Sequence, residues 1–324
     1  MEESNDRLIV VLGMHRSGTS AITRALKVLG VDLGGRLLLA ADGDDGDNET
    51  GFWEDIDFNG LNIELLRVID KDWFYTSPVT QIDLEILNKK GYFLKAETLV
   101  KEKLKDRKLF GVKDPRMAKL LPFWKEVFAR SDINVNYVLA IRQPLSVVKS
   151  IENRGWGGRE RIFLLWLNHV IESLSLTDNT SRVIVDYDHL MRDSEHELER
   201  MARSLNLPVD KKELDDYQSK FLDHNLQHSK YQPQDCGLDS DCPALAAEIY
   251  LKLQAVILES GCADDAGFQQ QVMQWTDEFD RLGPMLTYID RTLVEAIQAA
   301  GRQRQKESEN ADLRHEVAEN HRKF

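Results

Sequence analysis

The feature that most constrains the fold of this chain is an apolar segment that runs into a glycine-bearing loop. Residues 7–13 read RLIVVLG, which has the continuous apolar character of a strand buried on both faces. Residues 18–29 follow with apolar side chains at helical spacing. A strand, a glycine turn and a helix amino terminus favour anion binding, because backbone N–H groups and the helix dipole point at one place. This end of the chain therefore predicts an anion site.

Strand and helix patterns alternate along the following residues. Apolar segments within 108–117, 135–144 and 182–190 have strand character, and helical patterns separate them. Such alternation predicts a doubly wound, mostly parallel α/β sheet flanked by helices. Ligands of these sheets bind beyond the carboxyl ends of the strands. The charged segments HRSGTS, KDPR and RQP come at the ends of three strands, so we expect them to form one site.

The helical patterns set the expected domain organisation. Helices are expected over 51–69, 82–105 with an interruption near Gly91, 118–128, 145–153, 160–177 and 194–205. Residues 1–235 are expected to form the core, 236–300 a helical part that packs on or follows it, and 301–324 a charged helical tail or linker. The tail has little apolar surface to bury, so it is a candidate for binding a partner or a further domain.

Composition excludes several classes of protein. The formal net charge is −13, whereas a general nucleic-acid binder needs a basic face. No apolar run approaches the length of about 20 residues that a membrane-spanning helix needs. The amino terminus lacks the basic and long apolar regions of a signal peptide, and the 3 cysteines are too few and too late for a disulfide framework. These features predict a cytoplasmic protein, and the sequence contains no clear metal-binding cluster.

The glycine-bearing loop has the frame of a nucleotide P-loop but lacks its lysine. Residues 13–20 read GMHRSGTS, which matches GxxxxGK[ST] except that Thr19 stands where the lysine reaches the β- and γ-phosphates. The cation of this loop is instead Arg16. A P-loop kinase or ATPase needs that lysine and a magnesium site. The fold is therefore expected to be P-loop-like, with a loop that wraps an anion other than the usual nucleoside triphosphate.

Two motifs in order resemble those of the sulfotransferases that use 3'-phosphoadenosine 5'-phosphosulfate (PAPS). Their 5'-phosphosulfate loop has Lys or Arg before Ser-Gly-Thr-[ST], and their 3'-phosphate motif has a strand-end Arg with a Ser eight residues later. Arg142 and Ser150 have the second spacing. The resemblance covers residues 7–230 and includes VDYDHL, which is similar to the family's Tyr-Glu-Asp-Leu segment. It implies PAPS as co-substrate, bound by Arg142, Ser150 and the loop residues Met14, His15, Arg16, Ser17, Gly18, Thr19 and Ser20.

The resemblance also suggests catalytic residues. Members of this family place a glutamate shortly after the phosphosulfate loop and its helix, so Glu54 is the expected general base, with Asp55 and Asp57 as nearby competitors. His15 is a second candidate, although its place in the loop favours a contact with the cofactor. Lys113 resembles the lysine of a KDP motif, which stabilises the transferring group. The alternative for Lys113 is a structural ion pair at a strand end.

Three further residues are candidates for the acceptor side. Asp114 and Arg116 are expected either to orient the site or to bind the acceptor. Trp156 is expected near the cofactor or the acceptor, although an isolated tryptophan often only packs on a neighbour. The GFWE and KDPR segments resemble those of carbohydrate enzymes, which favours a carbohydrate acceptor over peptide tyrosine or a small metabolite.

The predicted activity is in-line transfer of the sulfuryl group of PAPS to an acceptor hydroxyl or amine. This chemistry requires no metal. Two alternatives remain at this stage: a P-loop nucleotide kinase or ATPase, and a noncatalytic binding module that keeps the fold.

Overall fold

The computed structural model of the chain describes residues 6–38, 51–222, 231–258 and 265–321. It divides into two compact units, Met1–Asp280 and Arg281–Phe324. The first unit contains every strand discussed below and the predicted site residues. The second consists mainly of one helix.

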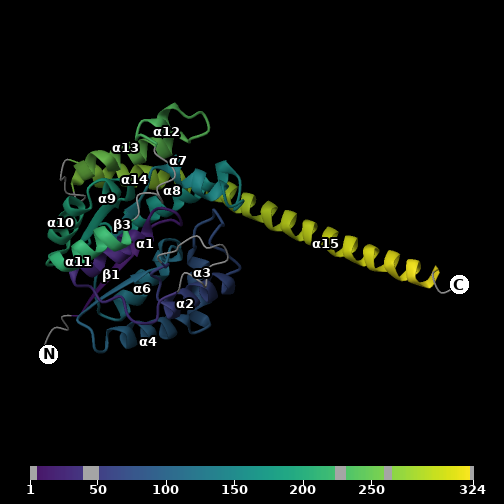
Figure 1. Cartoon of the computed structure of the whole chain (residues 1–324), viewed down its shortest axis with the longest axis horizontal. Coiled ribbons are helices and arrows are strands. Elements are labelled where there is room, and N and C mark those ends of the chain that lie inside the picture. The colour runs from purple at the N-terminus through teal and green to yellow at the C-terminus, as the bar shows by residue number, and fades with distance from the viewer. Residues whose placement is uncertain (1–5, 39–50, 223–230, 259–264, 322–324) are drawn as a thin grey trace. The chain divides into compact units, whose positions relative to one another are not determined.

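The first unit is built on a four-stranded parallel sheet with the strand order β2-β1-β3-β4. The strands are β1 (Arg7–Leu12), β2 (Leu109–Lys113), β3 (Asn134–Ile141) and β4 (Arg182–Asp186). Val11 of β1 is in register with Lys113 of β2 and Val138 of β3, so the carboxyl ends of these three strands lie at one edge. Figure 1 shows helices around the sheet, with α4 (Tyr92–Leu104) beside the edge strand β2 and α13 (Ala244–Leu258) beside the edge strand β4. The predicted doubly wound α/β fold is confirmed.

Helices connect the strands in the alternating pattern that the sequence predicts. Those of the first half are α1 (Thr19–Ala25), α2 (Ile56–Val68), α3 (Gln81–Lys89), α4 (Tyr92–Leu104), α5 (Arg116–Lys119), α6 (Leu121–Arg130) and α7 (Pro144–Glu152). They are followed by α8 (Arg159–Leu176), α9 (Tyr187–Arg192), α10 (Ser194–Leu205), α11 (Lys211–Asp216), α12 (Asp235–Leu238), α13 (Ala244–Leu258) and α14 (Ala266–Asp280). None of the helices in the described part of the chain is long and apolar enough to cross a membrane.

Capping side chains explain where two elements differ from their predicted bounds. The helix expected over 51–69 begins only at residue 56, because the Asp55 carboxylate accepts hydrogen bonds from the backbone N–H groups of Asp57 and Phe58. The strand expected over 182–190 ends at Asp186, which caps α9 in the same way. The predicted interruption near Gly91 is confirmed, and this residue has a φ of 81° between α3 and α4.

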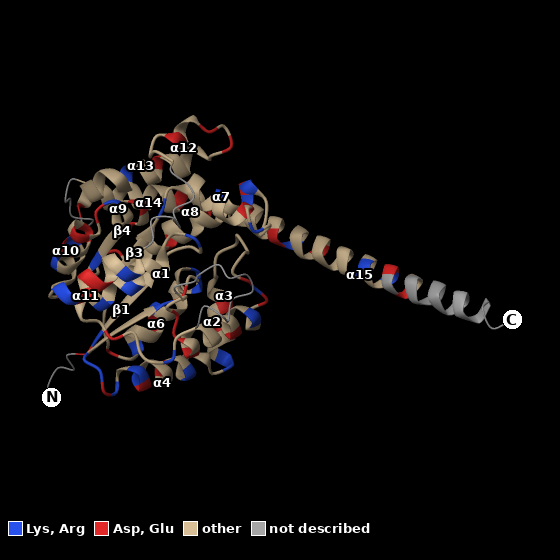
Figure 2. Ribbon diagram, in the orientation of Figure 1, with Lys and Arg blue, Asp and Glu red and all other residues tan. Residues whose placement is uncertain are grey.

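The carboxyl-terminal helices α13 and α14 belong to the first unit. Tyr250 and Gln254 of α13 donate hydrogen bonds of 3.0 and 2.9 Å to the Asp186 carboxylate at the end of β4. The second unit contains α15 (Gly283–His321), along which Figure 2 shows acidic and basic residues interspersed. Every side chain of α15 that the structure describes between residues 295 and 310 is exposed. The expected domain boundaries at 235 and 300 stay a prediction.

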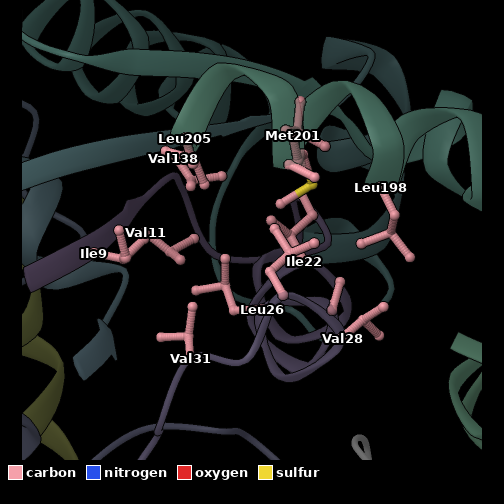
Figure 3. Close-up of a cluster of buried hydrophobic side chains, with 14 of the residues drawn as sticks. Ile9, Val11, Ile22, Leu26, Val28, Val31, Val138, Leu198, Met201 and Leu205 are labelled. Carbon is pink, nitrogen blue, oxygen red and sulfur yellow. The ribbon is translucent and has the colours of Figure 1, made fainter. Parts of the chain in front are cut away.

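A buried apolar cluster fixes α1, and therefore the loop before it, against the sheet. Ile22 and Leu26 pack with Val11 of β1, Val138 of β3 and Met201 of α10, and all five are 0% exposed (Figure 3). Full burial of one such side chain is worth about 1.5–3 kcal/mol. The loop thus joins a buried strand to a helix that the core holds in place.

Removing residues 302–324 should leave the stability of the chain nearly unchanged, because the described side chains there bury no apolar surface. We expect the melting temperature to change by less than about 2 °C, which corresponds to roughly 1 kcal/mol in a chain of this size. Differential scanning calorimetry of the truncated and full-length chains measures this change. A fall of more than about 4 °C would show that the tail contributes to the folded core.

Candidate active site

The loop between β1 and α1 depends on two closely packed glycines. Gly18 has a φ of 77°, and a Cβ atom at this residue would lie 2.1 Å from the Tyr187 ring. A Cβ atom at Gly13 would lie 2.6 Å from the Ala140 carbonyl oxygen of β3. The Ser17 N–H donates to the Met14 carbonyl oxygen at 3.2 Å and closes the turn. Only glycine fits at residues 13 and 18, and the loop therefore lies directly against β3 and α9.

Arg16 brings the loop and the second predicted motif together. Its Nε donates a 3.0 Å hydrogen bond to the Ser150 hydroxyl of α7. The Arg142 guanidinium, which follows β3, donates to the Arg16 carbonyl oxygen at 3.3 Å. Arg16, Arg142 and Ser150 therefore lie in one place, although the two motifs are more than 120 residues apart in the sequence.

Arg142 is held from several sides. Its Cζ lies 4.7 Å from the centroid of the Tyr187 ring, and its Nε lies 3.7 Å from the Asp188 carboxylate. The Trp166 indole donates to the Arg142 backbone carbonyl at 3.1 Å. Arg142 as a whole residue is only 7% exposed, so the orientation of its guanidinium is set before any ligand binds.

Arg154 is a third guanidinium at this place, and the sequence analysis did not identify it. Its Nη1 donates to the Ser150 backbone carbonyl at 2.7 Å and contacts the Ser150 hydroxyl at 3.3 Å. Arg154 follows Ser150 by four residues, so an arginine at helical spacing after the predicted phosphate-binding serine is the signal that could have identified it.

A buried ion pair lies on the other side of the loop. The Lys113 ammonium, at the end of β2, donates to Glu54 Oε1 at 2.8 Å and to the Ser20 hydroxyl at 3.3 Å. Asn59 donates to the second oxygen, Glu54 Oε2, at 2.7 Å. Lys113 is 2% and Glu54 6% exposed. The predicted base and the predicted cation are thus paired with each other beside α1.

The acidic neighbours of Glu54 serve as structural supports. Asp55 caps α2 with one carboxylate oxygen and forms an ion pair with Lys103 through the other. Asp114 is 0% exposed, and its carboxylate accepts hydrogen bonds from Asn62 and from Arg116, both at 3.0 Å. Burial, followed by the negative charge of Glu54, raises the pKa of Asp114. Of the two roles expected for Asp114, this placement fits orientation of Arg116.

Arg116 connects Asp114 with the ion pair. Its Nη1 lies 3.0 Å from the Asp114 carboxylate and 4.0 Å from that of Glu54. Its side chain is 18% exposed, so part of the guanidinium remains open to a ligand.

His15 lies in the loop with its ring against Trp73, at a centroid distance of 4.4 Å. Its Nδ1 is shielded from solvent and makes no hydrogen bond in the part of the chain that the structure describes. Burial, followed by the positive charge of Arg116, lowers the pKa of His15 well below its usual value. The ring is therefore neutral near pH 7.

Trp156 is 42% exposed, and its ring lies 5.8 Å from that of Trp73. Trp156 is predicted from the sequence, whereas Trp73 is not. The Trp73 ring contacts both Trp156 and His15. The aromatic run Trp73-Phe74-Tyr75 was the available signal. Among the described residues, no group of three or more His, Cys, Asp or Glu side chains is arranged to hold a metal ion.

The chain is similar in structure to two sulfotransferase domains. One, from the Synechococcus PCC 7002 olefin synthase, is 15% identical with a TM-score of 0.40, and the match covers 86% of this chain and 97% of that domain. The other, from the curacin biosynthetic pathway, is 16% identical with a TM-score of 0.44, and the match covers 77% and 98%. No family model matches the chain, and no curated protein matches it.

Alanine at Gly18 should destabilise the fold more than alanine at Gly30. Both residues have a positive φ, 77° and 75°, and so carry a similar backbone cost, but a Cβ atom at Gly30 meets nothing within 4 Å. Overpacking against Tyr187 should add about 1–3 kcal/mol to the loss at Gly18. Urea unfolding of Gly18→Ala and Gly30→Ala measures the difference. Equal losses would contradict the close packing of the loop on α9.

Proposed function

We propose that this chain is a sulfotransferase that moves the sulfuryl group of PAPS to an acceptor hydroxyl or amine group. The observation that carries the proposal is the meeting of Arg16, Arg142 and Ser150 at the carboxyl ends of β1 and β3. PAPS carries two anionic groups on one nucleotide, the 5'-phosphosulfate and the 3'-phosphate. The loop with Arg16 suits the first group, and Arg142 with Ser150 suits the second, because guanidinium groups bind phosphate oxygens in a fixed geometry.

The alternative of a P-loop kinase or ATPase fits the loop less well. Thr19 occupies the lysine position and is 5% exposed, so no side chain of the loop itself supplies an ammonium there. The Lys113 ammonium, which contacts the Ser20 hydroxyl, comes from β2 and is paired with Glu54. A cation that lies beside the loop suits a sulfuryl group, which carries less charge than a triphosphate and needs no metal for its transfer.

The proposed reaction forms one S–O or S–N bond and breaks one S–O bond. The acceptor oxygen or nitrogen attacks the sulfur in line with the oxygen that bridges to phosphorus, which leaves 3'-phosphoadenosine 5'-phosphate. The acceptor proton passes to the general base. Lys113 stabilises the charge on the sulfuryl and bridging oxygens, and Arg16 that on the phosphate. Positioning and preorganised charge supply most of the rate enhancement in such transfers.

Glu54 is the proposed general base, and His15 is its competitor. Lys113 and Asn59 each occupy one oxygen of Glu54, but a carboxylate offers about four acceptor positions, so it can still accept a proton. Its pairing with Lys113 would couple proton removal to stabilisation of the sulfuryl group. His15 is neutral and its Nδ1 lacks a partner among the described residues, which makes it the next candidate.

A carbohydrate is the favoured acceptor, on the resemblance of the GFWE and KDPR segments to those of carbohydrate enzymes. The charged tail of α15 is proposed to bind a partner or join a further domain. The cytoplasm stays the proposed compartment, because cysteines without a disulfide framework fit a reducing environment.

Arg142→Ala should weaken binding of 3'-phosphoadenosine 5'-phosphate about 10–100-fold, because a hydrogen bond to a charged group is worth roughly 1.5–3 kcal/mol. Binding of adenosine 5'-phosphosulfate, which lacks the 3'-phosphate, should change much less. Isothermal titration calorimetry measures both. Lys149→Ala is the matched control, because it removes an exposed charge from α7 next to Ser150. Equal losses for the two nucleotides would contradict the assignment of Arg142.

Glu54→Gln should lower turnover about 10²–10⁴-fold and leave nucleotide binding nearly unchanged, because it removes the proton acceptor and keeps the shape. Turnover is measured by mass detection of sulfated product on a panel of glycans, peptides and phenols. Glu278→Gln, which removes an exposed negative charge from α14, is the control for loss of one charge. Thermal unfolding of each variant shows whether Lys113 without its partner destabilises the fold.

Two results would overturn parts of this mechanism. Near-native turnover of Glu54→Gln, together with loss of turnover in His15→Gln at intact nucleotide affinity, would assign the base to His15. Strictly magnesium-dependent ATP hydrolysis without sulfuryl transfer would contradict the proposed function itself.

A further inference from the structure

Two partly exposed tryptophans lie beside the loop between β1 and α1, and their placement is not explained by burial in the core. Trp73 and Trp156 meet edge to face at 5.8 Å, and Trp156 is 42% exposed. Neither indole N–H makes a hydrogen bond to the residues that the structure describes. Buried tryptophans of this chain do use theirs, since Trp124 and Trp166 donate to Asn62 and to the Arg142 carbonyl. Trp73 and Trp156 therefore keep both an apolar face and a donor for a ligand.

The backbone that carries Trp73 is fixed by two cations. The buried Lys119 ammonium donates to the carbonyl oxygens of Tyr75 and Ser77 at 2.6 and 2.8 Å. Arg161 donates to the Phe74 carbonyl oxygen at 2.9 Å. A ligand that stacks on Trp73 would therefore contact a segment whose backbone is already ordered, which lowers the entropic cost of binding.

The pair of tryptophans, Trp73 and Trp156, borders the proposed transfer centre at one end. The ring of Trp73 lies 4.4 Å from that of His15, and the charges of Arg116, Lys113 and Arg16 all act on His15. At the other end, Arg154 lies 5.7 Å over the Trp156 ring and contacts Ser150. The two indoles thus extend from the Lys113 side of the loop to the end of α7.

We propose that Trp73 and Trp156 form the acceptor subsite, which takes a cyclic acceptor with an apolar ring face and a hydroxyl group at the ring edge. The ring face stacks on an indole, and an indole N–H donates to the oxygen of the hydroxyl group at the ring edge. A pyranose and a phenol share this chemistry. A linear alcohol offers no such face. The inference rests on the proposed function, because it assigns the second substrate of the same transfer.

The test uses the full chain loaded with 3'-phosphoadenosine 5'-phosphate and three probes: methyl β-glucopyranoside, 4-methoxyphenol and 1-hexanol. Quenching of tryptophan fluorescence and calorimetry give the affinities. We expect a cyclic probe to bind, and Trp156→Ala to weaken it about 3–10-fold, in line with the strength of one aromatic contact. Trp156→Tyr should restore most of the affinity. Whether Trp156→Ala lowers the affinity for the pyranoside or for the phenol shows which of the two rings the subsite binds.

Two variants separate the subsite from general effects. Trp73→Phe keeps an aromatic ring at this position and removes the N–H, so it should weaken binding of the cyclic probe and leave folding intact. Tyr288→Ala removes an exposed aromatic ring from α15 and should change no affinity.

Three results would overturn the proposal. The first is that neither cyclic probe binds, and the second is that the linear alcohol binds equally well with the same response to Trp156→Ala. The third is that Trp156→Ala weakens binding of the nucleotide itself, which would place Trp156 in the donor site. Wild-type nucleotide binding that depends on Arg142, together with any of these results, means that only this inference fails. Absence of nucleotide binding means that the proposed function fails.

Discussion

Parallel pairing of β1 with both β2 and β3 is the constraint on which the site depends. Val11 is in register with Lys113 and Val138, so three strands deliver their following residues to the same edge of the sheet. The loop after β1, the KDPR segment after β2 and Arg142 after β3 meet there because parallel strands end on one side. The packing of Gly13 and Gly18 against β3 and α9 then sets how closely the loop approaches these two elements.

Local charge at this edge differs from the charge of the whole chain. The chain has a formal net charge of −13, yet Arg16 and Arg154 contact the Ser150 hydroxyl, and Arg142 donates to the Arg16 carbonyl oxygen. Lys113 adds a buried ammonium on the other side of the loop, which Glu54 neutralises. Burial makes each of these charges more effective, because a low dielectric strengthens electrostatic interactions. An acidic chain can therefore hold a local cluster of cations, and its total charge does not describe this edge of the sheet.

The parts of the fold that the sequence predicts well are those set by local patterns. The apolar run of β1, the glycine loop and the break at Gly91 all follow from periodicity and backbone preference, which act over a few residues. The starts and ends of elements were less predictable. Asp55 and Asp186 end or delay elements because their carboxylates cap the next helix, and a carboxylate in a sequence does not show whether it will cap or catalyse.

Local patterns in the sequence were enough to predict the α/β class, the glycine-bearing loop between a strand and a helix, and the pair of motifs that contains Arg142 and Ser150. Only the tertiary structure decided that Arg16 bonds to Ser150, that Glu54 pairs with Lys113 and that Trp73 joins Trp156 to His15. Each of these contacts joins residues that lie more than 50 positions apart. Such contacts depend on how helices pack on the sheet, and no local pattern of residues encodes that packing.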